Sequence, residues 1–223
     1  MTRDSKADEI YSVPMGVTIK VLVGSLEQEF TIHKNLAIAK SDYFRTALSK
    51  QHGWQEAEQR TFEFAEENVT VFAGFVDYIY NGEVKYIESA PHSDVEMFLI
   101  ESYLLGERLG CMGFRNDVLV MLKSIWKDGP SVDAIKVAFR ESMEKSTMCR
   151  YLLDQCAWDA SAPVRKAILE DTLEEDAAPG FREGFLKALV LRDEAVASAL
   201  PAFTPYHPSF DLKYREHVVK DGE

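Results

Sequence analysis

The first regular pattern along the chain is an alternation of apolar and polar residues, which predicts a β-hairpin. In residues 17–23 every second position is apolar, the period of a strand that buries one face. Gly24-Ser25 provides a turn, and residues 28–33 read as a second strand. A shorter alternating segment over 61–64 predicts a third strand. The side chains expected on the buried face of the first strand are Val17, Ile19, Val21 and Val23.

After this hairpin the apolar spacing changes to three or four residues, which predicts helices. Asn35 and Ser41 are residue types that cap helix N-termini, so we expect a helix over 36–40 and another immediately after Ser41. Asn68 stands in the same position before a longer helix, and Gly82 follows its last turn, where glycine commonly ends helices. The front of the chain therefore combines a small sheet with several helices.

Two more amphipathic helices are predicted before Gly129-Pro130. Ser93 and Glu96 have the spacing of a capping box, so we expect their side chains to hold the first turn of a helix. This helix should run to Leu109 and stop at Gly110. The apolar residues between 114 and 126 predict the second helix.

Beyond Gly129-Pro130 the apolar pattern is helical, in stripes over 135–143, 148–158, 164–173 and 181–191. Because Gly and Pro together interrupt regular structure, we place a domain boundary at this pair. We accordingly expect a disordered tail over 1–15, a helical region over 131–200 and an irregular tail with three prolines over 201–223.

The charge balance bears on which partners the chain can bind. Its net charge is −12, from 25 Lys and Arg against 37 Asp and Glu. Nucleic acids and anionic membrane surfaces attract clustered basic side chains, and the densest basic stretch here is only Lys213-Tyr214-Arg215. No segment approaches the ~20 apolar residues of a membrane helix, and the charged N-terminus lacks the apolar core of a signal peptide. We therefore expect no nucleic acid and no membrane among the partners.

The three cysteines, Cys111, Cys149 and Cys156, are too few and odd in number for a disulfide framework. This usage suits a reducing compartment, so we expect a cytoplasmic and/or nuclear protein. Cys149 and Cys156 lie seven residues apart on one helical face, which favours core packing over a metal or redox role. The five histidines show no zinc-binding spacing, and we expect no metal and no cofactor.

No catalytic motif is present either. The sequence lacks a glycine-rich phosphate loop and a G-x-S-x-G turn, and its acidic clusters are typical of solvated helix faces. We therefore expect no catalytic residues and a non-enzymatic protein. The alternative is an enzyme with an unrecognised site in the helical half, for instance around Glu141, Glu144, Asp154 and Asp159.

Four short motifs follow one another along residues 16–127. The second predicted strand ends in Phe30-Thr31-Ile32-His33-Lys34. Ser41-Asp42-Tyr43-Phe44 opens the second of the two helices expected after this strand. The longer helix ends in Tyr78-Ile79-Tyr80-Asn81-Gly82, and residues 102–110 read SYLLGERLG. In this order the motifs resemble F-x-V-H-K, S-x-x-F, Y-I-Y-T-G and the penultimate helix of the BTB/POZ domain.

This resemblance implies an α+β fold: a small, mostly antiparallel sheet covered by a helical cluster over 16–127, followed by an all-α C-terminal region. The layout resembles that of the short fungal BTB proteins. The residues that match the family's fold signature are His33, Ser41, Phe44, Tyr78, Tyr80 and Gly82.

The same resemblance implies a protein–protein interaction module that serves as an adaptor or scaffold. Some members deliver substrates to cullin-type ubiquitin ligases through the loop after the Tyr-Ile-Tyr helix, which here spans 81–91. Within it, Tyr86-Ile87-Glu88 resembles the family's hydrophobic-x-Glu contact. The residues expected to contact a partner are Asn81, Glu83, Tyr86 and Glu88.

Two alternatives stay open at this point. Tyr86 can simply pack on its own domain while Glu88 is solvated, since a three-residue pattern is common. The protein can also act without a cullin, as a homodimer and scaffold or as a recruitment factor in transcriptional regulation.

Overall fold

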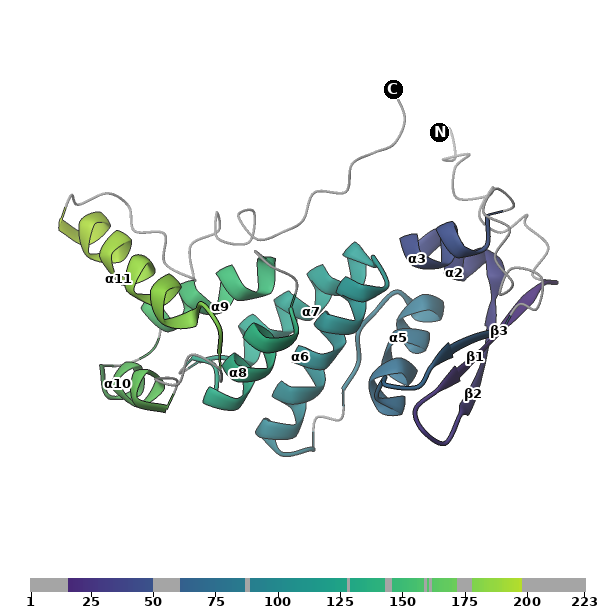
Figure 1. Cartoon of the computed structure of the whole chain (residues 1–223), viewed down its shortest axis with the longest axis horizontal. Coiled ribbons are helices and arrows are strands. Elements are labelled where there is room, and N and C mark those ends of the chain that lie inside the picture. The colour runs from purple at the N-terminus through teal and green to yellow at the C-terminus, as the bar shows by residue number, and fades with distance from the viewer. Residues whose placement is uncertain are drawn as a thin grey trace, which may run out of the picture. The chain divides into compact units, whose positions relative to one another are not determined.

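A computed structural model describes residues 16–49, 61–86, 89–127, 129–142, 146–158, 160, 162–171 and 178–197 (Figure 1). The chain divides into two compact units. The first comprises Met1–Lys85 with Arg108–Cys111, and the second comprises Tyr86–Glu107 with Met112–Glu223.

A mixed three-stranded sheet forms the first unit's framework (Figure 1). Its strands are β1 (Thr18–Val23), β2 (Gln28–His33) and β3 (Thr61–Phe64), in the order β2-β1-β3. The β1–β2 pair is the antiparallel hairpin predicted from the alternation, whereas β3 runs parallel to β1. Ile19, Val21 and Val23 are buried as expected, but Val17 precedes the strand and is 39% exposed.

In the part of the first unit that the structure describes, three helices accompany this sheet, namely α2 (Lys34–Lys40), α3 (Asp42–Ala47) and α5 (Val69–Asn81). The expectation that Asn35 caps α2 is wrong, because the helix already begins at Lys34. Its first N–H donates to the carbonyl oxygen of Val17 at 2.9 Å, so the start of β1 satisfies a group that a capping side chain would otherwise serve. Asn68 caps α5 as predicted, with Oδ1 accepting the Thr70 N–H at 2.9 Å.

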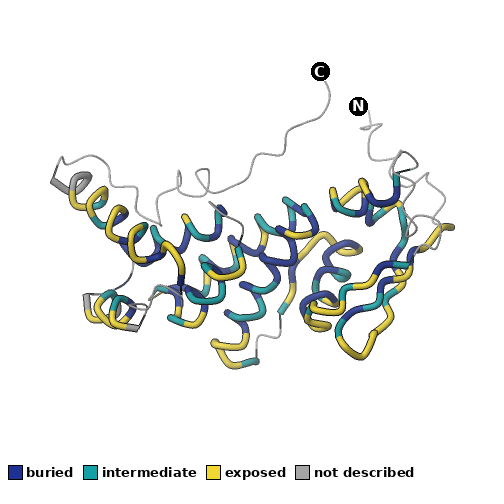
Figure 2. The backbone as a smooth tube through the Cα atoms, viewed as in Figure 1, coloured by how far each residue is buried: buried dark blue, intermediate teal, exposed yellow. Residues whose placement is uncertain are grey.

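Aromatic side chains fill the core of the first unit. Phe44 and Phe62 meet edge to face with ring centroids 5.2 Å apart, and Tyr43 contacts both rings. Phe72 contacts Phe30 at 5.2 Å from the far side of the cluster. Such rings bury a large apolar area for a small unit, and Figure 2 shows buried positions interspersed with more exposed ones along its strands and helices.

The second unit is helical throughout its described part. Its helices are α6 (His92–Arg108), α7 (Met112–Ile125), α8 (Val132–Glu141), α9 (Thr147–Trp158), α10 (Ala162–Asp171) and α11 (Phe181–Ala197). Each corresponds to an apolar stripe read from the sequence. The last residue of α6, Arg108, belongs to the first unit.

The predicted capping box at the start of α6 is wrong. The helix begins at His92, and the Ser93 Oγ lies 3.2 Å from the Asp94 Oδ1. Glu96 is buried, and its Oε1 accepts the Trp126 indole N–H at 2.5 Å and the Ser131 N–H at 2.9 Å. A buried carboxylate needs such donors, and here they come from distant parts of the chain rather than from its own helix.

Contacts within the second unit run across the Gly129-Pro130 pair. Glu96 joins α6 to Ser131, the residue that caps α8, and Trp126 stacks on Tyr151 of α9 with centroids 5.7 Å apart. The Ser146 Oγ donates to the Glu107 Oε1 at 2.7 Å. The helices on either side of the pair therefore share one compact unit, while the boundary expected there stays a prediction.

Candidate functional site

The segment that follows α5 is built around Gly82. Gly82 has φ of 74°, in the left-handed region that suits glycine, and its N–H donates to the Tyr78 carbonyl oxygen at 2.8 Å. Val84 is buried two residues later, whereas Asn81 and Glu83 are exposed. The segment is thus anchored through one apolar side chain and presents polar side chains to solvent.

Asp77 on the last turns of α5 organises these polar groups. Its Oδ1 accepts a hydrogen bond from the Asn81 Nδ2 at 2.5 Å, and its Oδ2 lies 3.5 Å from the Lys85 Nζ. Asp77 and Lys85 were not among the predicted contact residues. The i,i+4 spacing of Asp77 and Asn81 on a helix was the available signal.

Of the other two predicted contact residues, Tyr86 and Glu88, the structure describes only Tyr86. Tyr86 is half-buried and belongs to the second unit, whereas Asn81 and Glu83 belong to the first. Glu88 lies outside the described residues. The contact roles of Asn81, Glu83, Tyr86 and Glu88 therefore stay predictions.

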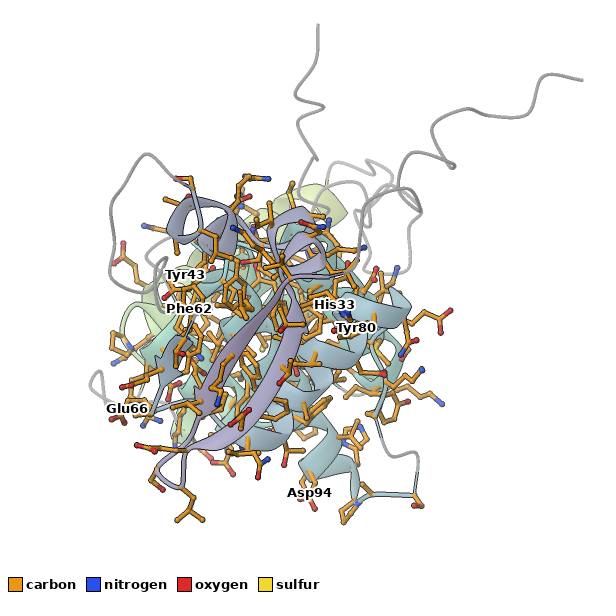
Figure 3. All side chains as sticks on the ribbon, turned by 90° about the vertical axis from the view of Figure 1, so that its right-hand side faces the viewer. His33, Tyr43, Phe62, Glu66, Tyr80 and Asp94 are labelled. Carbon is orange, nitrogen blue, oxygen red and sulfur yellow. The ribbon has the colours of Figure 1, made fainter. Side chains whose placement is uncertain are left out.

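Two fold-signature residues, His33 and Tyr80, form a direct pair (Figure 3). The Tyr80 Oη accepts the backbone N–H of His33 at 3.1 Å and lies 2.8 Å from its Nδ1. The pair ties the end of β2 to the last turn of α5.

A third signature residue, Ser41, makes two hydrogen bonds from one hydroxyl. Its Oγ accepts the Phe44 N–H at 3.3 Å, which caps α3, and donates to the Leu109 carbonyl oxygen at 2.6 Å. The Tyr43 N–H donates to the same carbonyl at 3.2 Å. The N–H groups at the start of α3, which have no partner within the helix, thus find acceptors in the turn after Arg108.

The same turn is held from another side by an ion pair that the sequence did not indicate. Arg108 donates from Nε to the Glu67 Oε1 and from Nη2 to the Glu67 Oε2, both at 2.6 Å. This two-point geometry is the strong form of an arginine–carboxylate pair. The remaining signature residues, Phe44 and Tyr78, are buried, and the Lys40 Nζ lies 5.3 Å from the centre of the Tyr78 ring.

The structure describes two of the four candidate chemical groups of the helical half. Glu141 is exposed beside Arg140, and Asp154 is half-buried, while Glu144 and Asp159 lie outside the described residues. Burial raises the pKa of the Cys149 thiol to about 11 and also raises the pKa of Cys156. Both cysteines are thus protonated at neutral pH. Cys156 is buried, as expected of core packing, whereas Cys149 is only half-buried.

Within the described ranges, no three His, Cys, Asp or Glu side chains are grouped closely enough to hold a metal ion. None of the helices described is both long and apolar enough to cross a bilayer.

A comparison with protein families places the front of the chain. Residues 15–106 match the family model described as the BTB/POZ domain, whereas no curated protein matches the chain. The match covers all four sequence motifs apart from the last residues of the fourth, and it confirms the predicted α+β class. BTB/POZ domains are protein-interaction domains, so the matched part of the chain is an interaction module. Residues 15–106 of this chain are therefore a BTB/POZ domain.

Proposed function

We propose that this protein is an adaptor that binds a partner through the segment over 81–91, and that the partner is a cullin-type ubiquitin ligase scaffold. The observation that carries the proposal is the BTB/POZ match over 15–106, which includes this whole segment. Binding of other proteins is what the family does. The segment and the partner are the parts that we add.

The described geometry supports the choice of segment. Gly82 and Val84 fix the backbone at the start of the segment, and Asp77 restrains both Asn81 and Lys85 there. A preorganised segment loses less conformational entropy on binding than a flexible one. Its exposed groups carry both charge signs, Glu83 and Lys85, which suits a protein partner with mixed charge better than a phosphate backbone.

The resemblance of Tyr86-Ile87-Glu88 to the hydrophobic-x-Glu pattern supports the choice of partner. In such a contact the aromatic ring supplies apolar area and the carboxylate meets a donor on the partner. Tyr86 is half-buried, so part of the residue is accessible.

The test is an affinity pull-down from native lysate that compares the wild type with the Tyr86→Ala/Glu88→Ala variant. Its matched control is Leu26→Ala/Glu66→Ala, which also removes one large apolar side chain and one glutamate. Leu26 is 93% exposed at the hairpin tip and Glu66 is exposed after β3, so neither change disturbs the core.

We expect a cullin and its ligase components with the wild type and the control, and their loss with the variant. Absence of a cullin from all three samples would contradict the adaptor role and leave a scaffold without a cullin, either dimeric or engaged in transcriptional recruitment. Equal recovery with all three would contradict the choice of segment.

A further inference from the structure

Asn81 and Gly82, where α5 ends, form the one Asn-Gly pair of the sequence. In such a pair the backbone nitrogen of the glycine can attack the side-chain amide of the asparagine, because glycine has no Cβ to hinder the approach. Asn81 is exposed, and a Cβ added at Gly82 would meet no heavy atom within 4 Å, so the pair is open to water. The signature Y-I-Y-T-G has Thr at this position, so the pair is a feature of this chain rather than of the signature.

Two hydrogen bonds hold the pair in a geometry that does not react. The Gly82 N–H donates to the Tyr78 carbonyl oxygen at 2.8 Å, which engages the nitrogen that would attack. The Asn81 Nδ2 donates to the Asp77 Oδ1 at 2.5 Å. Asp77 lies one helical turn earlier, so this bond directs the amide back along α5 and away from Gly82.

Both bonds belong to the part of the helix that opens most easily. The last turn of a helix frays, and a solvent-exposed hydrogen bond contributes little net free energy because water competes for the same groups. The side chain of Asp77 is 40% exposed. The reactive arrangement is therefore reached by local opening, without unfolding of the aromatic core.

We propose that Asn81 is a deamidation site whose rate is controlled by opening of the last turn of α5. When both bonds open, the Gly82 nitrogen loses its proton and forms a bond to the Asn81 Cγ. The bond from Cγ to Nδ2 breaks, and Nδ2 takes up the proton and leaves as ammonia, which gives a cyclic succinimide. Water then opens the ring at either carbonyl, to leave aspartate or isoaspartate. The net reaction converts an amide and water to a carboxylic acid and ammonia, with no oxidant or reductant.

Either product changes the start of the 81–91 segment. A carboxylate replaces the amide that donated to Asp77, and two like charges at i,i+4 destabilise a helix. Isoaspartate also lengthens the main chain by one methylene group between α5 and Glu83. Deamidation therefore releases the restraint that Asp77 places on this segment. The inference does not depend on which partner the segment binds.

The test incubates the full chain at mildly alkaline pH and follows the tryptic peptide over 61–85 by mass spectrometry. This peptide contains both Asn81 and Asn68. Asn68 is exposed but precedes Val69, whose branched side chain hinders attack, so Asn68 is an internal reference. Fragmentation assigns the gain in mass to one of the two residues and separates aspartate from isoaspartate.

Four samples are compared. They are the folded wild type, the wild type denatured in urea, Asp77→Ala and Ser41→Ala. Asp77→Ala removes the acceptor that holds the Asn81 amide. Ser41→Ala is the matched control, because it removes bonds at α3 and Leu109 and so weakens the first unit without touching the last turn of α5.

We expect conversion at Asn81 and not at Asn68 in the folded wild type, and a rate roughly three- to tenfold higher in Asp77→Ala. Ser41→Ala should match the wild type, and the denatured chain should react fastest, by about tenfold or more. An Asn81 that stays intact in folded Asp77→Ala while the denatured chain converts would overturn the proposal. Equal rates in the wild type and Asp77→Ala would also overturn it. So would an equal rise in Ser41→Ala, because the reaction would then require general unfolding of the unit.

Discussion

At the scale of single residues, the signature positions of this BTB/POZ domain act mainly by joining segments that are distant in sequence. Ser41 joins α3 to the turn at Leu109, and Tyr80 joins α5 to the end of β2. Each uses one hydroxyl for two hydrogen bonds. A short motif such as S-x-x-F therefore marks a tertiary contact as well as a helix cap.

Replacement of Ser41 by alanine should lower the free energy of unfolding by about 1–3 kcal/mol, because both the α3 cap and the bond to Leu109 are lost. Equilibrium urea unfolding followed by circular dichroism measures the change. Ser49→Ala is the matched control, since the Ser49 hydroxyl bonds only the nearby Thr46 carbonyl oxygen, and its expected cost is within ~0.5 kcal/mol. Similar losses in both variants would contradict the assigned role of Ser41.

The cysteines of α9 should react slowly with alkylating agents in the folded protein. The thiolate is the reactive form, and a pKa of about 11 for Cys149 leaves roughly one thiol in a thousand ionised at pH 8. Because the pKa is raised, the rate should increase as the pH rises toward 11. Iodoacetamide labelling across this range, with protein denatured in guanidinium as the reference, measures it. Labelling of native Cys149 at the denatured rate at pH 8 would contradict the burial described.

At the scale of elements, the glycines that follow helices are of two kinds. One kind only has a positive φ, whereas at the other kind an added Cβ would also clash with a neighbouring side chain. Gly82 has φ of 74° and no heavy atom within 4 Å of an added Cβ. Gly110 has φ of 61°, and an added Cβ would lie 2.8 Å from the Asp42 Cβ. Gly16 has neither constraint.

Alanine should therefore cost little at Gly16, about 1 kcal/mol at Gly82 and about 2–4 kcal/mol at Gly110, where overpacking adds to backbone strain. Thermal and urea unfolding of the three variants give the order. A Gly110→Ala variant as stable as Gly82→Ala would show that the turn after Arg108 can move away from α3.

Replacement of Glu96 should lower the free energy of unfolding more than replacement of an exposed glutamate in a helix. Glu96→Ala leaves the buried Trp126 indole and the Ser131 N–H without their acceptor, which we expect to cost about 2–4 kcal/mol. Glu141→Ala, at an exposed position in α8, should change stability by less than ~0.5 kcal/mol. Urea unfolding compares the two, and a neutral Glu96→Ala would contradict the stabilising role of its bonds to Trp126 and Ser131.

The elements themselves could be predicted from the sequence to within a few residues, because their signals are local. Apolar spacing indicated β1 and each helix, and Asn68 and Gly82 indicated the ends of α5. The partners of Glu96, the Arg108–Glu67 pair and the start of α2 could not be predicted. Each depends on a group that only the folded chain brings near, such as Trp126, Glu67 or the Val17 carbonyl.

At the scale of the whole molecule, a BTB/POZ domain is followed by helices that share a compact unit with its last part. Residues 86–107 lie in the same unit as α7 to α11, and Glu96 and Glu107 both bond residues beyond Gly129-Pro130. The family match ends at residue 106, so these helices lie beyond the matched range. For the candidate site, both the segment and its role were predicted from the family resemblance. The restraint by Asp77 became visible only in the structure.

The most direct test of the proposed adaptor role is the dissociation constant for a purified cullin N-terminal domain, measured by isothermal titration calorimetry. The wild type, Tyr86→Ala/Glu88→Ala and Leu26→Ala/Glu66→Ala are compared at one protein concentration and one salt concentration. We predict that the first and third bind alike and that the second binds at least about tenfold more weakly, since loss of a contact aromatic commonly costs more than 1 kcal/mol. Equal affinity in all three would contradict the proposed contact segment, and no binding by the wild type would contradict the proposed partner.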